Sequence, residues 1–198
     1  MRNTIVLILA AALGGCMATS PKKVTVEPKT SYQQIGATVY SPNDTGWSLA
    51  QMNKMGVAFG KQYVSPQDTA IANTFIFKVE GFDSDSEFLN YIAKQRKQQD
   101  DKKRFKIIDI NNEQVLFKNT SCLKYNGLSE DHKNSGINSA NYQYLKTAGY
   151  VCRHPSNKAI AFQMEISHRS SEKKFPEKLL SVGEEFFSSI QLNDKGLK

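Results

Sequence analysis

The sequence predicts an α+β protein in which an antiparallel β-sheet is packed with helices. Between residues 160 and 166, large apolar residues alternate with small or polar ones, as in a strand with one buried face. Ser84 followed by Glu87 is typical of a helix start. The elements then follow in the order strands, helix, four strands and helix, and such an antiparallel sheet needs helices over its apolar face.

The N-terminus has the pattern of an export signal. Arg2 supplies a positive charge, and residues 4–13 form an apolar run of about ten residues, whereas about 20 are needed to cross a bilayer. The following Leu13-Gly14-Gly15-Cys16 resembles the bacterial lipobox. This resemblance implies that residues 1–15 are a signal peptide and that Cys16 becomes the acylated first residue. The alternative is an ordinary secretory signal that is cut nearby.

The lipobox also predicts a location. Two or three acyl chains anchor a protein stably to a membrane, whereas a single chain binds only marginally. An aspartate directly after the lipobox cysteine would resemble an inner-membrane retention signal, but this chain has Met17 at that position. We therefore expect a lipid-anchored protein of the cell envelope, on the outer membrane facing the periplasm if the cell is Gram-negative.

The segment after the signal has the composition of a linker. Residues 16–46 hold three of the 6 prolines and show little periodicity, which predicts a flexible tether. The tail of this segment, residues 37–40, could already pair as a strand. Residues 47–198 then have the length and apolar content of a single α+β domain.

The first half of this domain predicts two strands and a helix. Residues 56–60 and 69–80 are rich in apolar residues, and the second run has Ile71, Phe75 and Phe77 on one parity. The helix follows from Ser84.

Four further strands and a second helix are predicted in the other half. Residues 105–110 and 113–122 should pair through a turn at Asn111-Asn112. Polar residues 126–141 are expected to form a long loop before strands at residues 142–154 and 159–168. Pro176 then begins a helix, and residues 187–192 close the domain.

Cysteine usage agrees with an oxidising compartment. Assigning Cys16 to lipid leaves Cys122 and Cys152, an even pair, and we expect a disulfide between them. Zinc held by Cys122, Cys152 and His154 is an alternative, but the short spacing of typical zinc ligands is missing.

Three stretches carry a resemblance to a known fold group. The sequences TFIFKVEGFDSDSEFLNYI, YVCRHPSNKAIAFQMEISHRS and KLLSVGEEFFSSIQL occur in an order that resembles the PsbP and Mog1-like proteins, over most of residues 47–192. The resemblance implies a sheet sandwiched with helices, and a binding or accessory role, because members of that group are mostly non-enzymatic. The insertion at 126–141 and the cysteine pair are not features of that group.

The charge balance suggests a binding surface. The chain holds 26 Lys+Arg against 19 Asp+Glu, a net charge of +7. Nucleic acid is excluded as a partner outside the cytoplasm, so an envelope protein or an anionic polymer is expected, in addition to the membrane. The alternative is a solvated helix face. The candidate basic surface consists of Lys94, Arg96, Lys97, Lys102, Lys103, Arg104 and Lys106.

Catalytic signals are weak. Ser129-Glu130-Asp131-His132 combines a nucleophile, carboxylates and a base, but adjacent residues rarely have triad geometry, and no G-x-S-x-G motif is present. We therefore predict no catalytic residue, no metal and no cofactor. A small envelope hydrolase remains the alternative to a binding protein.

Overall fold

The computed structural model describes residues 24–63, 65–98, 101–133 and 140–197. Eight strands in this part of the chain form one sheet in the order β1-β4-β5-β6-β10-β9-β8-β7, and three form a small sheet in the order β11-β3-β2. All strand pairs are antiparallel. The strands are β1 (Val24–Thr25), β2 (Ser31–Gln34), β3 (Ala37–Tyr40), β4 (Ser48–Asn53), β5 (Gly56–Gln62), β6 (Thr69–Lys78), β7 (Phe105–Phe117), β8 (Thr120–Asp131), β9 (Gln143–Arg153), β10 (Ile160–Ser170) and β11 (Gln191–Leu192). The helices are α1 (Asp85–Lys97) and α2 (Glu177–Ser189).

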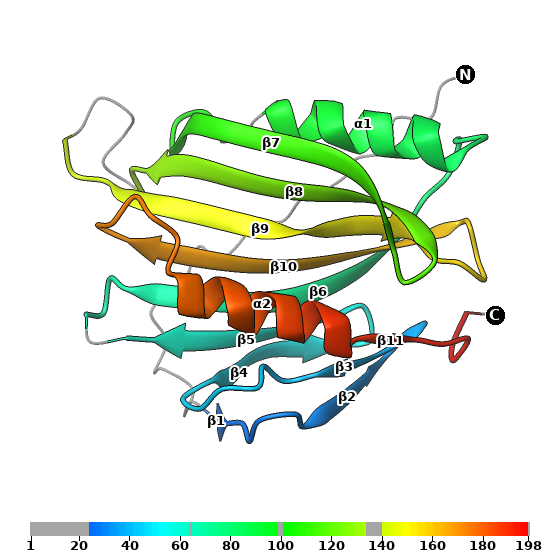
Figure 1. The fold of residues 1–198 in the computed structure, drawn as a ribbon, viewed down its shortest axis with the longest axis horizontal. Helices are drawn as coiled ribbons and strands as arrows, with labels where there is room; N and C mark the ends of the chain where they lie inside the picture. The colour runs from blue at the N-terminus through cyan, green and yellow to red at the C-terminus, as the bar shows by residue number, and fades with distance from the viewer. Residues whose placement is uncertain (1–23, 64, 99–100, 134–139, 198) are drawn as a thin grey trace.

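The large sheet is covered on both faces. Figure 1 shows α2 lying across the front of the sheet, with the small sheet below it. Phe162, Met164 and Ile166 pack in the core on this side, whereas their neighbour Ala161 belongs to the smaller core under α1. Adjacent residues of a strand point to opposite faces, so the two helices cover opposite sides. The predicted α+β fold class is confirmed.

Helix α1 begins where the sequence predicts it. The Ser84 hydroxyl accepts a hydrogen bond from the backbone N–H of Glu87, and the Glu87 carboxylate accepts one from the N–H of Asp83. These contacts satisfy N–H groups that have no partner inside the helix. Phe88 and Ile92 lie on the buried face of α1.

Helix α2 starts directly after Pro176, also as predicted. Leu179, Phe186 and Phe187 are buried against the sheet. At Gly183 the helix approaches so closely that an added Cβ would lie 2.7 Å from Cγ2 of Ile166. Glycine at this position therefore permits the helix to lie against β10.

The predicted disulfide is present. Cys122 of β8 and Cys152 of β9 are directly opposite each other, with Cα atoms 4.3 Å apart, and their sulfur atoms are bonded. Both side chains are fully buried. The bond therefore joins two neighbouring central strands inside the main core.

The described part of the expected tether, residues 24–46, is folded into the domain. Residues 24–46 contain three strands, and Val26, Ala37 and Val39 are buried in the main core. The expected boundary at residue 47 is therefore wrong, because apolar residues that are few but correctly spaced suffice to attach these strands. Cys16 and the predicted signal peptide lie outside the described residues.

The β7–β8 hairpin turns at a later position than expected. Strand β7 continues through Asn111-Asn112, and the chain reverses at Lys118 and Asn119, which have φ of 51° and 59°. Two consecutive residues with positive φ suit the twist of a tight hairpin. The predicted turn at Asn111-Asn112 is wrong, because both asparagines pair with β8.

The loop expected at residues 126–141 is also shorter. Strand β8 extends to Asp131, and its polar end pairs with β7 on one side and β9 on the other. Backbone hydrogen bonds to two neighbours therefore override the low strand propensity of these polar residues. Residues 134–139 lie outside the described part of the chain.

Candidate functional site

The structure separates the candidate basic surface into two groups, and the first makes contacts within the protein. The guanidinium of Arg96 lies 3.4 Å from the ring centroid of Tyr125. Lys106 pairs with Glu130 at 3.3 Å. Arg104 donates two hydrogen bonds to the Asp131 carboxylate, at 2.9 and 3.1 Å.

The second group faces solvent. Lys94, Lys97, Lys102 and Lys103 are exposed, and none forms an ion pair with a described residue. Asp101 shapes the turn that carries two of them, because its carboxylate accepts hydrogen bonds from the N–H groups of Lys103 and Arg104. We name these four residues the lysine surface.

Asp131 is the centre of a buried ion cluster that the sequence did not suggest. Its side chain is inaccessible to solvent and also pairs with Arg169 at 2.6 Å. Burial alone raises the pKa of Asp131, but the Arg104 hydrogen bonds and the Arg169 charge together lower it below its usual value. This cluster joins β8, β10 and the residues just before β7.

The Ser129 to His132 run does not form a catalytic triad. His132 contacts the Glu130 carboxylate at 3.1 Å, while Asp131 pairs with arginines. No hydrogen bond joins Ser129 to His132 among the described residues. The run is the end of a strand, where alternate side chains point to opposite faces.

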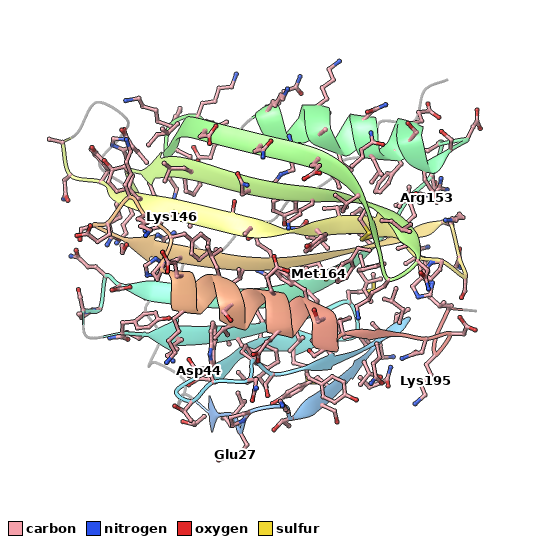
Figure 2. All side chains as sticks on the ribbon, viewed as in Figure 1. Glu27, Asp44, Lys146, Arg153, Met164 and Lys195 are labelled. Atoms are coloured by element: carbon pink, nitrogen blue, oxygen red, sulfur yellow. A yellow bond between two sulfur atoms is a disulfide. The ribbon has the colours of Figure 1, made fainter. Side chains whose placement is uncertain are left out.

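A cleft of about 350 Å³ lies at the N-terminal end of α2. Figure 2 labels Asp44 and Lys146 near this end of the helix. The walls come from β5, the β5–β6 connection, the end of β10 and the first turns of α2. The lining residues are Asp44, Lys61, Tyr63, Asp68, His168, Ser170, Glu172, Pro176, Lys178, Leu179 and Val182.

His168 is the most buried ionisable group of this cleft. Its Nε2 donates to the Asp68 carboxylate at 2.7 Å, and its ring contacts the rings of Tyr63 and Phe175. Nδ1 has no hydrogen-bond partner among the described residues. Burial, reinforced by the charge of Lys146, lowers the pKa of His168 although Asp68 opposes this. The lowered pKa favours the neutral imidazole, in which Nε2 carries the proton toward Asp68.

Lys146 lies directly beside His168 across the β9–β10 pair. Its Nζ donates to the Ser170 hydroxyl at 2.7 Å and to the backbone carbonyl of Glu172. Burial lowers the pKa of Lys146 to about 8. The pKa of Tyr63 shifts in the opposite direction. Burial and the charges of Asp44 and Asp68 raise it to about 12.

The sequence contains one signal for this cleft. His168 has the same parity as Phe162, Met164 and Ile166, which places a histidine on the buried face of β10. Its partner Asp68 is 100 residues away in the chain, so their contact required the tertiary structure.

The described residues form neither a metal-binding cluster nor a membrane-spanning helix. The described residues contain no group of three or more His, Cys, Asp or Glu side chains arranged to hold a metal ion. In the same part of the chain, every helix is too short or too polar to cross a bilayer.

Comparisons with known proteins identify the fold. No family model and no curated protein matches the sequence. The structure of the Ran-binding protein Mog1p from Saccharomyces cerevisiae matches with a TM-score of 0.53 and 9% identity, over 89% of this chain and 99% of that chain. A point mutant of the protein Mog1 matches with the same TM-score and identity, over 85% and 97%. Cyanobacterial PsbP from Synechocystis gives 0.46 and 10% identity, over 91% and 99%. The Mog1 matches show a common fold.

Proposed function

We propose that this protein is a lipid-anchored, non-enzymatic binding protein of the cell envelope, and that the lysine surface contacts an acidic face of a partner protein. The observation that carries this proposal is the group of four exposed lysines without ion-pair partners among the described residues. Complementary charge raises the rate at which partners associate and selects among them.

The fold is compatible with this role. One structure with the same fold is that of a Ran-binding protein, so this arrangement of sheet and helices supports protein recognition in at least one other chain. Lys102 and Lys103 lie on a turn attached to a rigid sheet, a common position for recognition residues.

Reversing the charge of Lys102 and Lys103 is expected to reduce partner capture severalfold. Arg104 is left intact because its ion pair with Asp131 supports the fold. The measurement is crosslinking in intact cells followed by mass spectrometry, comparing wild type with the Lys102→Glu/Lys103→Glu variant.

The matched control reverses the charge of two other exposed lysines, Lys54 and Lys195. This control changes the net charge by the same amount but leaves the lysine surface intact. It should therefore capture the partner at the wild-type level. Equal capture by all three proteins would exclude the lysine surface. Loss of binding to anionic vesicles with unchanged protein capture would instead identify a lipid surface as the partner. Ser170 lines the same cleft as His168, so labelling of Ser170 by a fluorophosphonate would favour the small hydrolase.

Replacing Cys16 by serine is expected to move the protein from the membrane fraction to the soluble fraction. The hydroxyl of serine cannot form the thioether through which the lipid is attached, so the acyl chains that anchor the protein are lost. Membrane fractionation with metabolic palmitate labelling measures this. Persistent palmitate incorporation in Cys16→Ser would refute acylation at Cys16.

A further inference from the structure

The cleft at the N-terminal end of α2 combines apolar and hydrogen-bonding walls. Leu179, Val182 and the ring of Tyr63 provide apolar surface, while Asp68 and His168 provide polar atoms. A volume of about 350 Å³ is at the small end of known ligand sites, which span about 300–1,000 Å³. The cleft therefore suits a small molecule with both apolar and polar faces.

Most charged side chains that line the cleft have partners within the protein; the exposed carboxylate of Glu172 forms no ion pair with a described residue. Asp44 pairs with Lys61 at 2.5 Å and with Lys178 at 3.7 Å. Asp68 accepts a hydrogen bond from His168, and beside the cleft the ammonium of Lys146 donates to the Ser170 hydroxyl and to the backbone carbonyl of Glu172. A charged ligand group placed beside Asp44, Lys61 and Lys178 would have to disrupt one of their pairs in a partly buried site, which costs more than binding a neutral group there.

The polar atoms of the cleft that can still bond to a ligand include both a hydrogen-bond donor and hydrogen-bond acceptors. The partly exposed Asp68 carboxylate has lone pairs left to accept hydrogen bonds from a ligand. The Tyr63 hydroxyl has no hydrogen-bond partner among the described residues and both donates and accepts. Hydroxyl groups on a ligand match such a mixed set, because each can donate one hydrogen bond and accept others.

We propose that this cleft binds a neutral sugar of one or two rings. The C–H faces of a sugar ring would contact Tyr63, Leu179 and Val182, and its hydroxyls would bond to Asp68 and Tyr63. The sugar could be free or the end of an envelope polysaccharide, since both present the same chemistry. This site is separate from the lysine surface, so either proposal can fail alone.

Trp47 offers a direct readout of binding. It is the single tryptophan of the chain, and it lies beside Lys61, whose Nζ is 6.0 Å from the indole ring centroid. The mature protein as isolated from cells would be titrated with glucose, N-acetylglucosamine, maltose and cellobiose while Trp47 fluorescence is recorded. Hydrogen exchange of the β5 and β10 ends would locate the bound sugar. Glucuronate and glucosamine serve as charged analogues of glucose.

At least one neutral sugar should bind, protect the cleft from exchange and bind more tightly than its charged analogue. Tyr63→Phe and Asp68→Asn should each weaken this binding about fivefold, the effect of one lost hydrogen bond. Tyr40→Phe, in a separate groove beside the C-terminal end of α2, and Asp194→Asn should leave it unchanged, as should Lys102→Glu/Lys103→Glu.

Three results would overturn the proposal. These are the absence of any response to the four neutral sugars, tighter binding of glucuronate or glucosamine than of glucose, and equal losses in the cleft variants and the control variants. To distinguish a free sugar from a polymer end, the titration would be repeated with a cellulose oligomer, and tighter binding of the oligomer than of cellobiose assigns the polymer.

Discussion

Replacing Asp131 by alanine is expected to lower the free energy of unfolding by about 3–5 kcal/mol, because removing one partner of a buried ion cluster leaves an uncompensated charge. Asp131 is 1% exposed and binds both Arg104 and Arg169. Arg169 is itself largely buried and would lose its carboxylate. Urea denaturation followed by circular dichroism measures the loss.

The matched control is Asp109→Ala, which removes an exposed carboxylate from β7 and should change stability by less than about 0.5 kcal/mol. The pH dependence provides a second test. Since the folded-state pKa of Asp131 is lowered, its ionised form stabilises the protein above its ordinary pKa of 3.8, and this contribution is lost as the pH falls below that value. A stability difference between wild type and Asp131→Asn that stays constant to pH 2 would contradict this account.

Removing the disulfide is expected to cost about 3.5 kcal/mol in the chain-entropy model for a closed loop of this length. Cys122 and Cys152 are separated by 30 positions, and their bond restricts the unfolded chain across the whole β8–β9 connection. The Cys122→Ala/Cys152→Ala variant should therefore unfold at a lower urea concentration than wild type. Chemical denaturation of both proteins measures the difference.

Burial adds a kinetic expectation for the same bond. Because both cysteines are fully buried, dithiothreitol should leave the bond intact in folded protein and reduce it once urea opens the structure. Thiol counting by mass spectrometry distinguishes the two states. Two free thiols in protein that was never reduced would show that the bond does not form.

Elements with a strong local signal were predicted well from the sequence. The Ser84 cap marked α1, Pro176 marked α2, and the alternation around Phe162 marked β10. In each case the residues themselves restrict the backbone or divide it into a buried and an exposed side. The Cys122–Cys152 pair was also predicted, because only two cysteines remained after Cys16.

Elements that depend on distant pairing were predicted poorly. Within residues 24–46 the sequence indicated a strand only at residues 37–40, which form β3, whereas β1, β2 and the pairing of β3 with β11 more than 150 residues away were not predicted. The polar end of β8 is a strand because it has neighbours on both sides. Local composition carries no information about such neighbours.

The same distinction applies to the candidate sites. Composition identified the segment that carries the lysine surface, but only the structure showed that Arg96, Arg104 and Lys106 contact other residues of the protein. The contact between His168 and Asp68 joins β10 to the β5–β6 connection, and nothing in either local sequence indicates it.

If the protein is anchored through Cys16, the strand order would set the height of its surfaces above the membrane. Strand β1 is at one edge of the large sheet and β7 at the other, so seven spacings of about 4.8 Å put roughly 34 Å between these edges. With acylation at Cys16, residues 16–23 would span at most about 28 Å between the lipid and β1. If the sheet stands on its β1 edge, Lys102 and Lys103 lie at the far edge, just before β7. Their distance from the membrane surface would then be well above the Debye length, which is about 8 Å at physiological ionic strength. In that orientation the lysines would be beyond the reach of the charge on the lipid head groups and available to proteins in the aqueous compartment.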